Sequence, residues 1–414
     1  MSDIDSRDAS TGADRMGELL IGTDRFGRFD WSDPWPTYDR LRAEAPYWQN
    51  PEGVTILTRY ADCEAVLRDA RFSSSNDHAD PPMILAEGDP RGFMDGGAAP
   101  LIFLDPPDHT RIRKLVNKAF TPRSVERLRP RVQQVVDGIL DRAADEGGLD
   151  VVADLGYELP VIVICELLGV PLSDRPQFSG WSSDASRLLD DDLSEAELNA
   201  GVVAAISFAQ YFAELFEVRR ADPRDDLVSG LLAAEEEGDR LSVEELHSIV
   251  ILLFIAGHET TMNLIGNGTN ALLGQRDQLV RWRDDPSLDG PAVEELLRFD
   301  GPVHLTGRIP VEDVEINGHL FPRGKQAVTL LAAANRDPAR FDHPDRLDLL
   351  RPDNHQLTFS QGIHYCLGAA LARLEGQVAI GSLIRRFPDI ERAAPPVYRN
   401  HFVLRGLTEL RVSV

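Results

Sequence analysis

A single helical pattern, beginning at Ser242 and continuing to about Leu273, limits the architectures open to this chain of 414 residues. Ser242 and Glu245 have the spacing of a capping box, which predicts where the helix begins. At 1.5 Å per residue, a helix of roughly 30 residues spans about 45 Å, which is enough to cross a whole domain. The sequence therefore predicts a large domain built around one long helix.

Most of the other long segments also have helical spacing. Apolar residues recur at helical intervals over 369–386, and a shorter helix is expected over 61–67. Strand patterns are confined to alternating residues at 54–56 and 410–414 and to a turn-rich stretch over 311–331. The predicted fold class is mainly α with small β-sheets, in a single large domain.

Charge and hydropathy restrict the partners and the location of the protein. The formal net charge of −25 argues against nucleic acid, because phosphate backbones attract Lys and Arg. Residues 1–20 are polar and lack the basic start and apolar stretch of a signal peptide, so we expect a flexible tail followed by one domain over 21–414. The longest apolar run, Ile249 to Ala256, is shorter than the ~20 residues that span a bilayer. We expect a cytoplasmic monomer that is not anchored in a membrane.

The chain has three cysteines, Cys63, Cys165 and Cys366, and no CxxC pair. The small, odd number of cysteines indicates a reducing compartment. The lack of a CxxC pair argues against a structural zinc site. Cys63 and Cys165 are interpreted as small buried core residues, and Cys165 ends an apolar run. Cys366 differs because it comes directly before the helix predicted over 369–386. A helix N-terminus lowers the pKa of a thiol and so favours the thiolate.

The segment around Cys366 resembles the haem-binding loop of the cytochrome P-450 family. The matching positions are Phe359, Gly362, His364, Cys366 and Gly368. The resemblance covers roughly residues 30 to 414 and implies the cytochrome P-450 fold, with the long helix lying over a haem b cofactor. It implies that Cys366 is the thiolate ligand of the haem iron, and that the other four residues belong to the cofactor site.

The middle of the long helix resembles the oxygen-binding segment of the same family. The resemblance implies that Ala256 and Gly257 lie against the haem, that Thr260 hydrogen-bonds dioxygen and that Glu259 relays protons. A threonine hydroxyl can replace a helical hydrogen bond, so we expect a local opening of the helix. The alternative is a capped helix break with a solvated glutamate.

Four basic side chains are expected to bind the two haem propionates. His109 and Arg113 are four residues apart and share one face of a predicted helix. The resemblance implies that Arg308 and His364 join them, since Arg and His make charge-assisted hydrogen bonds to carboxylates. Pro310, two residues after Arg308, departs from the family pattern, which often has a small residue there. The alternative for each is an ordinary surface charge.

Glu295 and Arg298 resemble the ExxR pair of the family. Three residues apart on a helix, they share one face. The resemblance implies a structural network on the cysteine side of the haem; the alternative is a surface ion pair, which would stabilise little.

The substrate pocket is predicted from apolar positions. Residues 73–100 are rich in Gly, Pro and Asp but contain apolar side chains, which is typical of a binding loop or lid; the alternative is a disordered surface excursion. A sizeable hydrophobic substrate is expected. The expected substrate-facing residues are Met83, Ile84, Leu85, Phe93, Leu253, Ala256, Val303, Leu305, Phe402 and Val403.

The resemblance implies a haem-dependent monooxygenase that inserts one atom of dioxygen into a hydrophobic small molecule, by hydroxylation or epoxidation, in bacterial secondary metabolism. Electrons would come from a ferredoxin and its reductase, which would dock on a basic face formed by Arg111, Lys114, Lys118 and Arg123. Two alternatives stay open, a peroxide-using haem-thiolate enzyme and a non-catalytic haem sensor. The pairing of Glu259 with Thr260 favours dioxygen activation.

Overall fold

The computed structural model describes residues 29–51, 53–81, 98–186, 188, 194–236, 239–399, 401 and 403–414. The tail predicted over 1–20 lies outside these residues. The α-helices are α3 (Trp35–Glu44), α4 (Tyr60–Arg68), α5 (Asp108–Ala119), α6 (Pro122–Glu126), α7 (Arg129–Glu146), α8 (Glu158–Leu168), α9 (Arg175–Ser186), α10 (Glu195–Ala221), α11 (Leu227–Ala233), α12 (Val243–Gly274), α13 (Arg276–Asp284), α14 (Asp289–Asp300), α15 (Leu331–Ala334) and α16 (Ala369–Arg386). The strands are β1 (Tyr47–Gln49), β2 (Thr55–Leu57), β3 (Phe72–Ser73), β4 (Gly148–Asp150), β5 (Glu235–Glu236), β6 (Asp239–Arg240), β7 (Leu305–Pro310), β8 (Val314–Ile316), β9 (His319–Phe321), β10 (Ala327–Leu330), β11 (Glu391–Arg392), β12 (Val397–Tyr398), β13 (Leu407–Glu409) and β14 (Arg411–Ser413).

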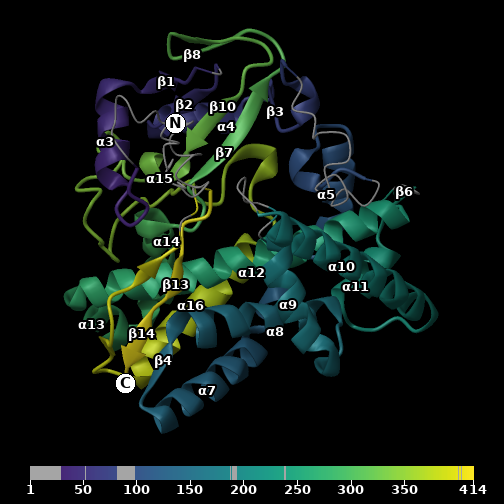
Figure 1. Ribbon diagram of the computed structural model, residues 1–414, viewed down its shortest axis with the longest axis vertical. Helices are drawn as coiled ribbons and strands as arrows, with labels where there is room; N and C mark the ends of the chain where they lie inside the picture. The colour runs from purple at the N-terminus through teal and green to yellow at the C-terminus, as the bar shows by residue number, and fades with distance from the viewer. Residues whose placement is uncertain are drawn as a thin grey trace, which may run out of the picture.

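Helix α12 crosses the middle of the molecule. Its first turn has the predicted capping box: the Glu245 amide donates to Ser242 Oγ over 3.1 Å, and the Ser242 amide donates to the Glu245 carboxylate over 2.8 Å. Helices α7, α8 and α16 lie on one side of it, and strands β7 and β10 lie on the other (Figure 1). Most of its side chains are buried, so the predicted long central helix is confirmed.

Helices α10 and α12 are, by length and composition alone, long and apolar enough to cross a membrane. The apolar stretch of α12 is 72% buried inside the protein, which is the burial expected of a core helix. Length and composition are therefore weak evidence for a membrane span here.

The β structure is small and follows the predicted turns. The largest sheet has the order β1-β2-β10-β7-β3. β1 and β2 form a hairpin that includes the strand pattern at 54–56, with Gly53 at a φ of 85°. β8 and β9 are joined by Asn317 and Gly318, whose φ values of 51° and 81° are those of a tight hairpin turn. The predicted fold class is confirmed.

Cys63 on α4 and Cys165 on α8 are both 0% exposed. Burial raises the pKa of the Cys165 thiol to about 12, because an apolar environment disfavours the thiolate. Both cysteines are core residues, as predicted.

Candidate active site

Cys366 lies between a short 3-10 turn at Gly362–His364 and the first turn of α16. Its amide donates to the carbonyl of Phe359 over 2.9 Å, which closes the loop. Gly362 has a φ of 71°, and a side chain there would lie 2.6 Å from the carbonyl oxygen of Leu67. The glycine is therefore needed for both the backbone conformation and the close approach of α4.

The pKa of the Cys366 thiol is subject to opposing effects. Burial raises its pKa, while the amides of Gly368 and Ala369 and the guanidinium groups of Arg113 and Arg373 lower it without reversing the direction. The helix N-terminus therefore has the expected effect on the sulfur, but burial outweighs it. A bound metal cation removes the proton of a coordinating thiol outright.

Four basic side chains from three separate segments gather beside this loop. His109 and Arg113 come from α5, Arg308 from β7, and His364 from the 3-10 turn. The rings of His109 and His364 are 4.4 Å apart between centroids. Arg113 Nη2 donates to the carbonyl of Tyr365 over 2.8 Å, next to Cys366.

This cluster lacks negative charge. Among the described residues, neither Arg113 nor Arg308 forms an ion pair, and both ring nitrogens of His109 and Nε2 of His364 have no hydrogen-bond partner. Burial lowers the pKa of Arg308 to about 10, although Asp105 opposes the shift. Burial lowers the pKa of His364 to about 3, and the neighbouring Arg308 and His109 lower it further.

The nearest carboxylate is already engaged. Asp105 accepts hydrogen bonds from the hydroxyl of Ser73 and the amide of Ser74, and it lies 3.6 Å from His78 Nε2. Buried cations that lack a partner are costly, so the cluster is suited to an anionic ligand.

The exposed middle of α12 forms another wall. Ala256 is exposed on a helix that is otherwise largely buried, and a Cβ on Gly257 would meet no atom within 4 Å. Leu253 is half-buried one turn earlier. The Thr260 hydroxyl donates to the Ala256 carbonyl over 2.7 Å, while the helix continues through this point. The expected local opening of the helix is therefore absent, because the helical pattern is kept alongside the hydroxyl bond.

Glu259 is buried and only 4% exposed. It forms an ion pair with Arg399, which comes from the segment after β12. The alternative of a capped helix break with a solvated glutamate is therefore wrong. The Glu259 side chain is paired with Arg399, a partner that the sequence analysis did not predict.

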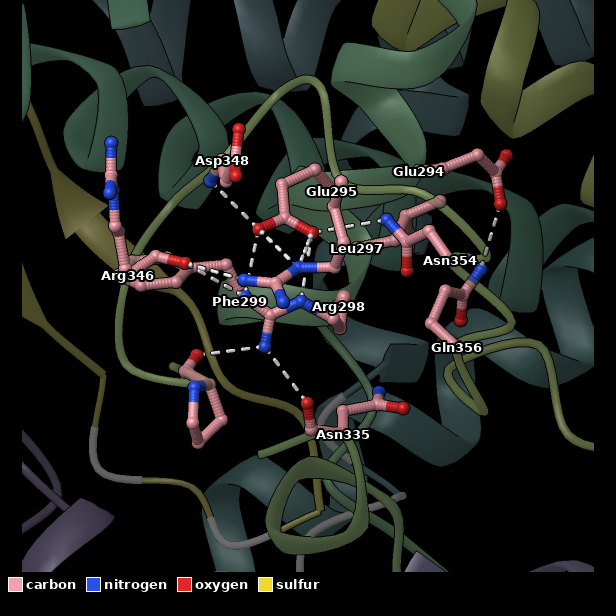
Figure 2. A network of polar contacts seen from close by, with 12 residues as sticks. Glu294, Glu295, Leu297, Arg298, Phe299, Asn335, Arg346, Asp348, Asn354 and Gln356 are labelled. Carbon is pink, nitrogen blue, oxygen red and sulfur yellow. Dashed lines mark hydrogen bonds and ion pairs between the residues drawn. The ribbon is translucent and has the colours of Figure 1, made fainter. Parts of the chain in front are cut away.

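Glu295 and Arg298 form a bidentate ion pair on α14, with both N–O distances 2.8 Å and exposed fractions of 1% and 0% (Figure 2). Arg351 Nε also donates to Glu295, over 3.1 Å. The surface ion pair considered as the alternative is excluded by this burial. Three backbone carbonyls accept hydrogen bonds from Arg298, those of Asn335 (2.9 Å), Pro344 (2.8 Å) and Arg346 (3.1 Å).

The structure describes part of the predicted substrate pocket. Val303 forms an isolated bridge with Leu404, which brings half-buried Val303, Leu305 and Val403 to one region. Outside the described residues lie Met83, Ile84, Leu85, Phe93 and Phe402. Two exposed apolar residues, Ile102 and Phe103, lie just before α5.

One predicted docking residue is placed differently from the expectation. Arg111 forms ion pairs with Glu245 and, over 3.3 Å, with Asp239, so its charge is directed at α12 and β6. The predicted basic face must be corrected to Lys114, Lys118 and Arg123, which are exposed.

The sequence analysis also did not identify two buried polar residues near Thr260. Glu375 on α16 is 1% exposed, and burial raises the pKa of its carboxyl to about 8. Its burial could have been predicted from the sequence, because Glu375 shares a helical face with the apolar residues Leu371 and Val378. Asn263 on α12 is 1% exposed and had no such signal.

Cys366 and the basic cluster beside it fit haem. In the part of the chain that is described, no group of three or more His, Cys, Asp or Glu could hold a metal ion. A metal bound by Cys366 therefore needs ligands from outside the protein, and the four nitrogens of a porphyrin provide them. His109 and His364 have ring nitrogens without hydrogen-bond partners, and Arg113 and Arg308 form no ion pair among the described residues, so these side chains match the two propionates.

Comparisons with known proteins agree with this geometry. The profile of the cytochrome P-450 family matches residues 290–403. Vitamin D(3) 25-hydroxylase of Pseudonocardia autotrophica is 44% identical over 411 residues, covering 96% of this chain and 99% of that protein. This chain belongs to the cytochrome P-450 family. As in other cytochromes P-450, its cofactor is haem b, and it is a monooxygenase that uses dioxygen and a hydrophobic substrate.

Two further relatives also match this cytochrome P-450 over most of its length. The 6-deoxyerythronolide B hydroxylase of Saccharopolyspora erythraea is 40% identical and covers 93% of this chain and 96% of its own. The crystal structure of CYP109E1 from Bacillus megaterium in complex with testosterone has a TM-score of 0.82 and 32% identity, covering 92% of this chain and 98% of that chain.

Proposed function

We propose that Cys366 would bind the haem iron through its thiolate and that His109, Arg113, Arg308 and His364 would bind the propionates. The observation that supports this best is the basic cluster, four buried or half-buried donors without a carboxylate, directly beside the one cysteine at a helix N-terminus. Phe359, Gly362 and Gly368 shape the loop on the sulfur side, and Ala256 and Gly257 form the opposite wall.

Haem, when bound, supplies the binding and reductive activation of dioxygen. The protein has to exclude water, orient the substrate and deliver protons at the right place. We assign the last task to Thr260 and Glu259, which are neighbours on α12 with one side chain half-buried and the other buried. Glu295 and Arg298 hold the scaffold beneath the cysteine loop.

The test of the ligand is Cys366→Ala, with Cys63→Ala as the matched control. The first variant is expected to lose the carbon monoxide difference spectrum typical of a thiolate-bound haem, and the control to keep it, because Cys63 is sealed in the core. A Cys366→Ala protein that keeps that spectrum would remove the assignment.

The proposed substrate is a sizeable, largely apolar molecule that is hydroxylated or epoxidised in bacterial secondary metabolism. Relatives whose names or titles include vitamin D(3), 6-deoxyerythronolide B and testosterone support this class. The half-buried apolar residues Leu253, Val303, Leu305 and Val403 support it from the side of the pocket. A spectral screen for a ligand-induced spin-state shift is expected to find binders among sterol-like and macrolactone compounds and none among sugars.

The proposed electron donors are a ferredoxin and its reductase, which dock on Lys114, Lys118 and Arg123 at the surface of α5 and α6. Charge reversal of Lys114 and Lys118 to Glu is expected to slow haem reduction by about tenfold at low salt, and the effect should shrink as salt rises. Arg323→Glu, an exposed charge in the turn between β9 and β10, is the control. An unchanged reduction rate would exclude this face.

We further propose that the protein is a monomer in the bacterial cytoplasm. Light scattering of the purified protein and fractionation of the producing cells test these two points separately.

A further inference from the structure

Helix α12 has a row of buried polar side chains in an otherwise apolar core. Glu259, Asn263, Asn267 and Asn270 follow one another at intervals of four, four and three residues, so they share one face of the helix. All are less than a tenth exposed, at 4%, 1%, 1% and 8%. This face lies against the C-terminal segment that contains β12 and β13.

The amides of Asn267 and Asn270 donate hydrogen bonds, although Asn267 Oδ1 has no partner among the described residues. Asn267 Nδ2 donates to the carbonyls of Asp300 (3.2 Å) and Arg405 (3.1 Å). Asn270 Nδ2 donates to the Tyr398 hydroxyl over 3.1 Å, and Arg392 Nε donates to Asn270 Oδ1 over 2.9 Å. These contacts attach the C-terminal segment to α12.

Glu259 and Asn263, the first two residues of the row, have different contacts. Arg399 pairs with the carboxylate of Glu259. Within the same segment the amide of Arg399 donates to the carbonyl of Gly406 over 2.9 Å. Gly406 lies so close to Asn263 that a Cβ there would overlap its amide. One point of the C-terminal segment therefore contacts both Glu259 and Asn263.

Asn263 differs from the other asparagines of the row because neither polar atom of its side chain has a partner in the described part of the chain. Both its Oδ1 and its Nδ2 lack a partner among the described residues, although the side chain is 1% exposed. An unsatisfied buried polar group is costly, and such groups usually bind ordered water. At 100° per residue, Asn263 points between the directions of Glu259 and Thr260, one turn further along the helix.

We propose that Arg399 is a positioning residue for proton delivery: it holds the Glu259 carboxylate ionised beside the partly exposed guanidinium, and Asn263 holds the water that joins Glu259 to Thr260. This inference rests on the proposed roles of Thr260 and Glu259. Each turnover consumes dioxygen, two electrons from the ferredoxin, two protons and one substrate C–H bond, and yields a hydroxylated product and one water. When protons arrive at the wrong place, the same two electrons and two protons leave with dioxygen as hydrogen peroxide.

The burial of the pair explains why Arg399 is needed. Its own side chain is 30% exposed, whereas that of Glu259 is 5% exposed, so the guanidinium connects an enclosed carboxylate to the surface. A buried carboxylate that loses its cation takes up a proton and no longer accepts one from outside. His258, the preceding residue, does not replace Arg399, because burial lowers its pKa to about 4 and leaves it neutral.

The experiment compares Arg399→Gln with Arg399→Lys and with the matched control Arg392→Gln, which removes a bond of the same segment to Asn270. In Arg399→Gln we expect an unchanged substrate-induced spin shift, a fall of about tenfold in product formed per electron pair with a matching rise in hydrogen peroxide, and a larger solvent deuterium isotope effect on turnover. Arg399→Lys is expected to recover most of the coupling, and Arg392→Gln to behave as the wild type.

A second readout does not depend on turnover. Burial keeps Glu375 protonated at neutral pH, since its pKa is raised to about 8, so one protonated carboxyl band is expected in every variant. In the ferric protein at neutral pH, infrared spectroscopy of Arg399→Gln is expected to show an additional protonated carboxyl band that is absent from the wild type and from the double variant Arg399→Gln with Glu259→Gln. Asn263→Leu, of similar size but unable to bind water, is expected to lower coupling without producing that band.

The inference is overturned if Arg399→Gln keeps wild-type coupling and lacks the band, or if Arg392→Gln loses coupling to the same degree. Should Arg399→Gln not fold, Asn263→Leu and Arg399→Lys decide the matter through coupling and the isotope effect. A wild-type enzyme that forms no oxygenated product would instead contradict the proposed function, and the infrared band would still test the ion pair by itself.

Discussion

Replacing Glu375 by Gln tests how this protein tolerates an acid in its core. Glu375 on α16 is 1% exposed, its Oε1 has no hydrogen-bond partner, and burial raises its pKa from 4.5 to about 8, although Thr261 opposes the shift. In the unfolded chain the carboxyl ionises above pH 4.5, whereas in the folded protein it keeps its proton up to about pH 8. The unfolded state therefore binds fewer protons between these values, so stability falls as the pH rises.

The size of the effect follows from the two pKa values. Each pH unit between them removes about 1.4 kcal/mol of stability, so the full loss on passing from pH 4.5 to pH 8 is about 5 kcal/mol. A glutamine at this position does not titrate. The free energy of unfolding of Glu375→Gln, minus that of the wild type, should therefore increase by about 2.7 kcal/mol between pH 5.5 and 7.5.

The assay is urea unfolding of the ferric holoenzyme at several pH values, followed by tryptophan fluorescence. Wild type and variant are compared at equal haem loading, so that the contribution of the cofactor cancels in the difference. Glu146→Gln, at the exposed end of α7, is the matched control and should give a difference that does not vary with pH. A constant difference for Glu375→Gln as well, or one that falls with rising pH, would refute the reasoning.

Three further substitutions test the scaffold. Arg298→Ala leaves Glu295 without its bidentate partner and should cost about 3–5 kcal/mol of stability in the same unfolding assay, because it breaks a buried ion pair; a loss below 1 kcal/mol would mean that the pair contributes little. Gly362→Ala imposes a side chain on a φ of 71° next to the Leu67 carbonyl, so it should cost at least about 1–2 kcal/mol and weaken haem retention, measured by transfer to apomyoglobin; unchanged retention would contradict this. Ser242→Ala removes the cap of α12 and should cost about 1 kcal/mol, whereas Ser242→Asp should restore most of it in thermal unfolding.

Local features were predictable because they depend on residues close in sequence. The helix expected over 369–386 is α16 with the same bounds, and the turn-rich stretch over 311–331 contains the hairpin turn at Asn317 and Gly318. The placement of Cys366 before a helix followed from the same kind of signal. Each of these rests on hydrogen bonds or side-chain periods within a few residues.

Partners far along the chain were not predictable in this way. Arg111 was expected to face a redox protein, but Glu245 and Asp239 take its charge. The continuity of α12 at Thr260 was also missed, since a threonine can either open a helix or bond within it, and only the surrounding packing selects one.

The sequence by itself determined the fold class, the central helix and the cysteine loop, since these follow from periodicity, capping and turn residues that act over short distances. Tertiary structure alone decided which charges are neutralised and which are left for a ligand. It joined Glu259 to Arg399, enclosed Glu375 and left His109, Arg308 and His364 without a carboxylate. The physical reason is that burial and ion pairing depend on contacts between distant segments, which no local pattern encodes.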